Sequence, residues 1–294
     1  METDAFSRCH PAVNFLFFAG AIGFGVVIQH PAYLLVSILG GAVYYLLLHG
    51  RCGIKMLTSM LPLFLLLTAV NPLFNTYGST VLFHLFGRPY TMEALVYGAA
   101  IAAVFVVMLL WFGCYNAVMT SDKFISLFGN LIPALSLLLV MVLRMIPSLM
   151  GKARQIIGVR KSVGKGFQTS NRAKIEEGMT VLGSLTSWAL EGSIVTADSM
   201  RSRGYGSTRR TSFTVYRMTA ADWGLVAGIL LLMVAVVIAA AMGCTKAVFT
   251  PQWEIAPVAG VNCFGLAAYC AYLFLPTALH IKEAIQWHIS RSRI

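Results

Sequence analysis

Seven apolar runs, each close to the length that a helix needs to cross a bilayer, are the feature that most constrains the fold of this chain. They cover residues 11–29, 32–48, 56–73, 92–114, 124–143, 223–243 and 258–279. A helix of about 20 residues spans the hydrocarbon core and satisfies its backbone amides internally, which lipid cannot do. Because 58% of the side chains are hydrophobic and only 11% are charged, little charge is left for a water-soluble surface. The sequence therefore predicts an all-α, polytopic membrane protein.

Positive charge is concentrated between residues 144 and 217. That stretch holds 13 Lys and Arg against 4 Asp and Glu, and so supplies +9 of the formal net charge of +11. A basic excess of this kind marks the cytoplasmic side of a membrane protein. Since no stacking aromatic residues are interleaved with the arginines, we expect no nucleic-acid partner, whereas the headgroups of the lipid bilayer are an expected contact.

The sequence predicts three blocks. They are an N-terminal transmembrane block (1–143), a cytoplasmic coupling-helix block (144–221), and a C-terminal transmembrane hairpin with a tail (222–294). Arg51 and Lys55 place the loop between the second and third runs inside, and therefore the N-terminus inside as well. A full crossing by residues 124–143 would then put the basic block outside. We therefore expect this run not to cross fully, with a kink at Pro133, and expect six spans with both termini cytoplasmic.

Two long amphipathic helices are predicted in and around the basic block. In the first, apolar residues recur at steps of three and four over residues 139–156. In the second, one face carries the apolar stripe Val181, Leu182, Leu185, Trp188, Ala189, Gly192 and Val195. Small residues in this stripe allow close helix contact. We expect Leu185, Trp188 and Val195 to pack on the first helix or on a partner.

The second helix ends in the basic sequence "SMRSRGYG". Arg201 and Arg203 fall in its last turn, where free carbonyl groups favour a cation by about 0.3 to 1 kcal/mol, and Gly204 is a natural left-handed stop. Helix capping alone would explain basic residues followed by glycine at any helix end. That interpretation stays open beside a functional one.

No catalytic or metal-binding motif stands in the sequence. "GVRKSVGKG" resembles a phosphate loop, but its spacing is one residue too long, and Gly166 stands where Ser or Thr must hold magnesium. The histidines form no H-E-x-x-H motif and the cysteines no C-x-x-C pair. We expect no enzyme activity, no cofactor and no metal site. The predicted spans carry almost no ionisable residues, which disfavours a proton- or sodium-coupled carrier working alone.

The basic helix pair, with "SMRSRGYG" ending its second member, resembles the T component of energy-coupling factor (ECF) transporters. In that family two long coupling helices each end in a short motif of the form Ala-Arg-Gly. Ser202, Arg203, Gly204 and Tyr205 match the second motif, with Ser in place of Ala. The sequences of residues 71–80 and 121–147 are also similar to T components, so the resemblance covers most of the chain.

The first helix departs from the pattern of this family. Ser162, Val163 and Gly164 stand where the family has Ala-Arg-Gly, so the arginine of the first motif is missing. Arg160 and Lys161, in the preceding turn, are the candidate substitutes. The first coupling motif is therefore assigned to these five residues without its central arginine.

The resemblance implies a membrane scaffold without enzymatic activity. Such a subunit links two ABC-type ATPase subunits, which Arg201 to Tyr205 would contact, to a membrane-embedded S component that binds a vitamin or a metal ion. It implies the plasma membrane of a bacterium or archaeon as the location. Two other interpretations are a self-contained multi-pass permease and a membrane protein whose basic block binds only lipid headgroups.

Overall fold

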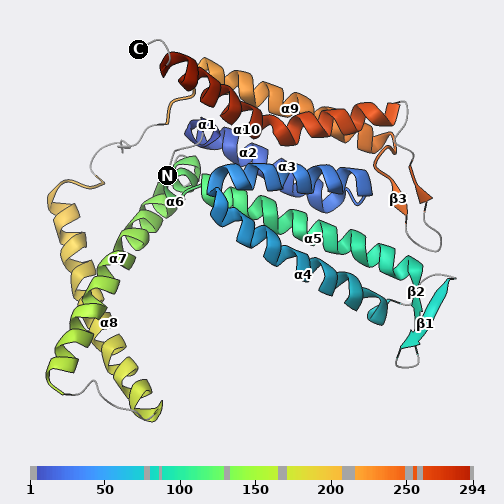
Figure 1. Ribbon diagram of the computed structural model, residues 1–294. Coiled ribbons are helices and arrows are strands. Elements are labelled where there is room, and N and C mark those ends of the chain that lie inside the picture. Colours follow the sequence, from blue (N-terminus) through green and yellow to red (C-terminus); the bar gives the residue numbers. More distant parts are fainter. Residues whose placement is uncertain are drawn as a thin grey trace. The chain divides into compact units, whose positions relative to one another are not determined.

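The computed structural model describes residues 5–75, 80–85, 88–128, 133–164, 171–206, 216–248, 254–256 and 261–291. Its helices are α1 (Ala5–Arg8), α2 (Pro11–Val27), α3 (Pro31–His49), α4 (Arg51–Phe74), α5 (Met92–Val118), α6 (Ser121–Phe128), α7 (Pro133–Ser162), α8 (Asn171–Ser202), α9 (Ala220–Ala241) and α10 (Val261–Arg291). Two short antiparallel hairpins pair β1 (Val81–Leu85) with β2 (Arg88–Thr91) and β3 (Ala247–Val248) with β4 (Glu254–Ile255) (Figure 1). The predicted all-α membrane fold is confirmed.

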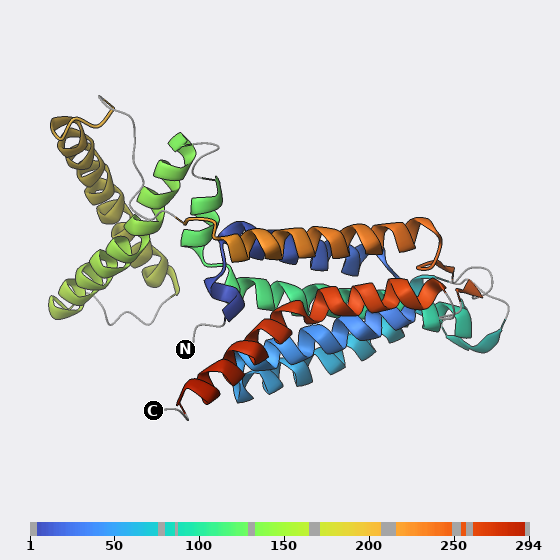
Figure 2. The same ribbon diagram turned by 90° about the horizontal axis from the view of Figure 1, so that it is seen from above.

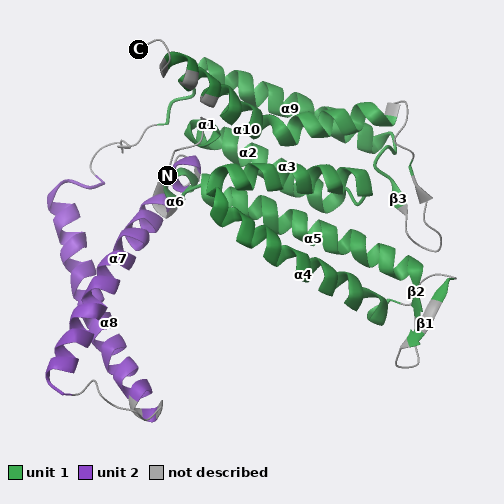
Figure 3. Ribbon diagram, viewed as in Figure 1, with its two compact units in different colours: residues 1–124, 216–294 green, residues 125–215 purple. Residues whose placement is uncertain are grey.

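The chain divides into two compact units (Figure 3). Unit 1 comprises residues 1–124 and 216–294, and unit 2 comprises residues 125–215. The sequence placed the first boundary at residue 143, whereas unit 2 already begins at residue 125. Helix α7 carries both the apolar residues 133–143 and the basic residues that follow them, so these apolar residues belong to unit 2 with the basic helix pair. The C-terminal hairpin shares unit 1 with the N-terminal helices.

Helices α2, α3, α4, α5, α9 and α10 form a bundle in unit 1 (Figures 1 and 2). Helix α5 packs on α2, α3 and α4, while α10 packs on α3 and α9. The first two of these helices begin alike, each with a histidine before a proline. His10 and His30 each accept a hydrogen bond at Nδ1 from the backbone amide two residues further on, at 3.2 and 3.3 Å. The proline costs no hydrogen bond at the first position of a helix.

Aromatic side chains fill the core of this bundle. The ring centroid of Phe17 lies 5.2 Å from that of Phe6, 5.8 Å from Trp111 and 5.1 Å from Tyr272, and all four side chains are fully buried. The indole nitrogen of Trp111 donates to the Ser37 hydroxyl at 2.9 Å. Because its polar atom is satisfied inside the protein, this large side chain can be buried without a hydrogen-bonding penalty.

Glycine residues allow the helices to approach closely. A Cβ atom at Gly98 on α5 would lie 2.7 Å from the Cβ atom of Asn71 on α4. A Cβ atom at Gly265 on α10 would lie 2.6 Å from that of Ala239 on α9. Contacts of this kind are typical of membrane helices, where van der Waals packing rather than the hydrophobic effect holds the helices together.

The N-terminal segment is tied to one end of the bundle. Arg8 on α1 forms an ion pair with Glu283 near the end of α10. The His10 amide donates to Oδ1 of Asp222 at 3.3 Å, and Asp222 also forms the capping box that begins α9. Lys123 on α6 donates to the Ser7 hydroxyl at 3.0 Å. These contacts hold α1, α6, α9 and α10 together at that end.

Among the described residues, six helices are long and apolar enough to cross a membrane: α3, α4, α5, α7, α9 and α10. The number agrees with the six spans that the sequence predicted, but the sequence counted α2, which is shorter at 17 residues, in place of α7. Within residues 124–143, α6 ends at Phe128 and α7 begins at Pro133, and residues 129–132 lie outside the described part of the chain. The kink expected at Pro133 falls at the edge of this gap and stays a prediction, while Pro147 lies inside α7.

Candidate functional site

The long helices α7 and α8 of unit 2 are the two predicted amphipathic helices. In both views they cross like the strokes of an X, with their C-terminal ends on the same side of the crossing (Figures 1 and 2). Val181 on α8 is buried, and Leu185 and Trp188 are partly buried. The Nζ atom of Lys152 on α7 lies 5.8 Å from the centroid of the Trp188 ring. This cation–π contact, worth about 0.5 to 1 kcal/mol at exposed sites, joins the two helices.

The predicted apolar stripe of α8 is partly corrected by the structure. Leu185 and Trp188 are partly buried, as predicted, but Leu182 and Val195 are 59% and 63% exposed. Each residue turns the side-chain direction by about 100° around a helix, so Leu182 points away from the direction of its buried neighbour Val181. Nothing in the described chain covers Val195, and its packing on a partner stays a prediction.

A second apolar stripe on α8 is exposed, and of its members only Leu182 belonged to the stripe predicted from the sequence. Its members follow one another at helical spacing and are each more than half exposed: Ile175, Met179, Leu182, Leu190 and Ile194. Thr186 lies among them, but its hydroxyl donates to the Leu182 carbonyl at 2.9 Å and so is turned back onto the helix. Helix α8 therefore presents an apolar surface beyond the one it buries against α7.

The C-terminal end of α8 is closed by its own backbone. The Arg203 amide donates to the Ser199 carbonyl at 3.2 Å, the Gly204 amide to the Arg201 carbonyl at 3.0 Å, and the Tyr205 amide to the Met200 carbonyl at 3.0 Å. Gly204 has a φ of 77°, which confirms the predicted left-handed stop. The carbonyls of Ser199, Met200 and Arg201 thus have amide partners.

The side chains at this end remain exposed. Arg201, Ser202, Arg203 and Tyr205 all lie on the surface, and Tyr205 is 52% exposed. In the part of the chain that the structure describes, neither guanidinium group forms an ion pair with a carboxylate. Since the backbone already closes the helix, capping does not require Arg203.

The C-terminal end of α7 has the same backbone construction. The Val163 amide donates to the Val159 carbonyl at 3.2 Å, the Gly164 amide donates to the Lys161 carbonyl at 3.1 Å, and Gly164 has a φ of 77°. Val163 therefore occupies the position that Arg203 has on α8, and it is 69% exposed. Ser162 is exposed as its counterpart Ser202 is, and its hydroxyl donates to the Gly158 carbonyl at 3.1 Å.

The two candidate substitutes for the missing arginine lie in different surroundings. The Nε atom of Arg160 is buried and has no hydrogen-bond partner in the described chain, so this side chain is partly drawn in against the protein. Lys161 is exposed and lines a groove of about 370 Å³ between α7 and α8, together with Ile157, Lys174, Glu177, Gly178 and Val181. Neither takes the place of Arg203 at the end of the helix.

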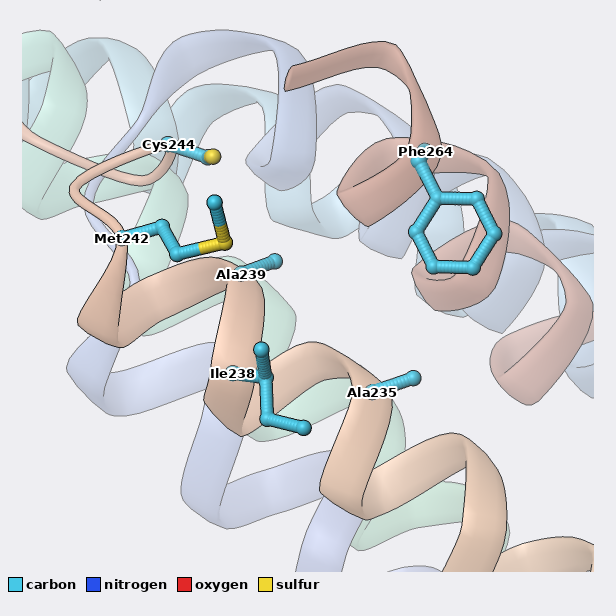
Figure 4. A pocket seen from close by; sticks show the side chains of 6 residues that line it. All are labelled: Ala235, Ile238, Ala239, Met242, Cys244 and Phe264. Atoms are coloured by element: carbon cyan, nitrogen blue, oxygen red, sulfur yellow. The ribbon is translucent and has the colours of Figure 1, made fainter. Parts of the chain in front are cut away.

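A small pocket lies between α9 and α10 of unit 1 (Figure 4). Its volume is about 140 Å³, and its lining is Ala235, Ile238, Ala239, Met242, Cys244 and Phe264. No charged side chain and no hydroxyl or amide side chain lines it, so it offers a polar solute no specific contact. No cluster of three or more metal-ligating side chains occurs among the residues that the structure describes.

Fold and site together define a multi-pass membrane protein that carries a basic pair of crossed helices with exposed apolar surface. No model of a known protein family matches the chain, and no curated protein sequence matches it.

Proposed function

We propose that this chain is the transmembrane scaffold and energy-coupling subunit of an ECF-type importer. It links two ABC-type ATPase subunits to a membrane-embedded S component that binds a vitamin or a metal ion. The observation that carries the proposal is the exposed Arg203 at the left-handed end of α8, where backbone amides already bond the carbonyls of Ser199, Met200 and Arg201.

Arg203 suits a contact with a carboxylate in a groove of an ATPase subunit. A guanidinium group is planar and can donate two parallel hydrogen bonds to one carboxylate, each worth about 1.5 to 3 kcal/mol. Gly204 and Gly206 adopt φ values of 77° and 90° and have no side chain. The chain is therefore thin on both sides of Tyr205, so that the helix end can enter a narrow groove and transmit movement of the ATPase to α8.

The exposed stripe from Ile175 to Ile194 supports a second partner, the S component. Each of its five apolar side chains would gain about 25 cal/mol per Å² of apolar surface when a partner helix covers it. Five such side chains on one helix face form a continuous contact surface. A membrane-embedded subunit with apolar helices is the partner that this stripe fits best.

The interior of unit 1 supports a scaffold over a self-contained permease. The core is filled by the rings of Phe6, Phe17, Trp111 and Tyr272, and the charged residues of its helices stand near their ends. An ion- or solute-coupled carrier ordinarily places ionisable groups along its path. No observation on the described bundle favours such a path.

The distribution of charge supports cytoplasmic termini and a cytoplasmic helix pair. Arg51 and Lys55 begin α4, and Lys282 lies near the end of α10. The chain direction alternates between successive spans of unit 1, so these cations share the end that carries Arg8 and Lys123. Basic residues gather on the cytoplasmic side of membrane proteins. The plasma membrane of a bacterium or archaeon is the location that the resemblance supports.

The test compares Arg203→Glu with Arg172→Glu in the whole transporter. Both residues are exposed arginines of the α8 segment, but Arg172 lies at the opposite end of the helix. We expect Arg203→Glu to lower both ATPase co-purification and substrate uptake more than tenfold. Arg203→Lys should have an intermediate effect, because it keeps the charge but loses the planar guanidinium group and its two parallel hydrogen bonds. If the two glutamate variants had equal effects, or if Arg203→Glu had none, Arg203 would have no role beyond capping α8.

A further inference from the structure

Two buried polar side chains of unit 1 have no hydrogen-bond partner among the residues that the structure describes. Asn14 on α2 is fully buried, and neither its Nδ2 nor its Oδ1 atom is bonded. Thr277 on α10 is 4% exposed, and its hydroxyl is also without a partner. A primary amide can donate two hydrogen bonds and accept two more. Because burying such groups unpaired is costly in a membrane protein, a partner is expected.

A backbone group of α10 lacks its usual partner as well. Pro276 lies inside α10 and has no amide hydrogen. The carbonyl of Tyr272, four residues earlier, therefore receives no helix hydrogen bond from position 276. The hydroxyl of Thr277, on the next residue, does not bond this carbonyl either. Proline is tolerated in membrane helices where neighbouring helices, hydroxyl side chains or ordered water bond the freed backbone groups.

The three groups lie at one level along the axis of the bundle. The Tyr272 hydroxyl donates to the Phe17 carbonyl and so fixes the level of α10 against α2. Asn14 lies three residues before Phe17, about 4.5 Å along α2, and Thr277 lies about 7.5 Å beyond Tyr272 along α10. Both steps lead toward the end where Arg8 is ion-paired, because α2 begins and α10 ends there. Helical side chains lean toward the start of their own helix, so these two lean toward a common level.

We propose that this level of the bundle is an internal water site. Ordered water bonds the Asn14 amide, the Tyr272 carbonyl and the Thr277 hydroxyl, and so joins α2 to α10 beside the proline. A buried water molecule makes about three hydrogen bonds, which matches these three groups. Water suits them better than a cation, because the Asn14 amide nitrogen donates and no carboxylate is among the three. The site needs no partner subunit, so its test is independent of the proposed function.

A double-mutant cycle tests whether Asn14 and Thr277 share this site. Asn14→Leu and Thr277→Val replace the polar side chains by apolar ones, and thermal unfolding in detergent gives the midpoints of the single and double variants. We expect each single change to lower the midpoint by about 2 to 4 °C, because it leaves the other polar groups and the water with an unmade bond. The double variant should lose clearly less than the sum of the two shifts, because the first change has already broken the site.

Thr68→Val is the matched control for this cycle. The Thr68 hydroxyl donates to the Phe64 carbonyl of its own helix at 2.8 Å, so its shift should add to that of Asn14→Leu. If the cycle with Thr277 were equally additive, the two side chains would not share a site. If the single changes at positions 14 and 277 raised the midpoint, these polar groups would be unpaired in the native protein. Either result would overturn the proposal.

A direct measurement needs no variant. A crystal structure of the protein, at a resolution that shows ordered water, should contain a density peak about 2.7 to 3.2 Å from an amide atom of Asn14 and from the Tyr272 carbonyl oxygen. The indole nitrogen of Trp111, which donates directly to Ser37, should have no such peak beside it. A map with ordered water elsewhere and none beside Asn14 would overturn the internal water site.

Discussion

The Tyr272 hydroxyl on α10 donates a hydrogen bond to the carbonyl oxygen of Phe17 on α2, 2.6 Å away. The hydroxyl lies beside Gly20, where a Cβ atom would collide with it and would approach Cε of Met233 to 3.0 Å. Helices α2 and α10 thus approach closely at Gly20, which has no side chain.

Gly20→Ala should therefore destabilise the bundle. The Tyr272 ring is fully buried and cannot yield to a new methyl group, and overpacking of this kind costs about 1 to 3 kcal/mol. Thermal unfolding of the purified protein in detergent measures the effect as a lower midpoint. Gly23→Ala on the same helix is the control, because a Cβ atom there meets nothing within 4 Å. Equal midpoints for the two variants would contradict the packing described for Gly20.

Lys152 and Trp188 should couple energetically. A double-mutant cycle with Lys152→Ala, Trp188→Leu and the pair should give an interaction free energy of about 0.5 to 1 kcal/mol, because each single change removes the same cation–π contact. Thermal or denaturant unfolding monitored by circular dichroism provides the four values. Arg154→Ala is the matched control, since Arg154 is an exposed cation two residues further along α7. If a cycle with Arg154 in place of Lys152 gave the same interaction free energy, the coupling would not come from a specific contact between Lys152 and Trp188.

The exposed stripe of α8 should hold the S component. Leu190→Glu places a charge in its middle, where Leu190 is 61% exposed, and should reduce co-purification of the S component without reducing insertion of the protein into membranes. Ser184→Glu adds the same charge at an exposed position on another face of α8 and should have little effect. Unchanged recovery of the S component with Leu190→Glu would identify this face as lipid- or solvent-exposed surface.

Residue 165 should be cytoplasmic. In a variant whose native cysteines are replaced, Lys165→Cys should react with a membrane-impermeant maleimide only after the cells are permeabilised. Lys246→Cys, just before β3 and at the end of the bundle opposite to Arg51, should react in intact cells. Labelling of position 165 from outside would overturn both the orientation of the chain and the proposed site of ATPase contact.

The sequence predicted the spans and the helix ends well because both depend on local signals. Runs of apolar residues set the helices of unit 1, and Gly164 and Gly204 adopt the left-handed conformation that ends α7 and α8. The kink expected at Pro133 stays a prediction, because the residues just before this proline lie outside the described part of the chain.

Contacts between distant residues were not predictable in the same way. Nothing in the sequence around Lys152 indicates that its side chain will lie over Trp188. Similarly, Val181 is buried and its neighbour Leu182 is exposed, although the two are adjacent in the sequence. The stripe was read from periodicity alone, which gives the spacing of apolar residues but not the side from which the partner helix approaches. The exposed stripe could have been found as a second periodic set on α8.

The ion pair between Arg8 and Glu283 has a consequence for biosynthesis. The ribosome makes α1, which carries Arg8, long before α10, which carries Glu283, and Phe6 packs on Phe17, which in turn packs on Tyr272 of α10. The α1 segment therefore lacks these partners until α10 has been made. A product truncated before α10 would leave α1 and α2 without the contacts to α10 that hold them.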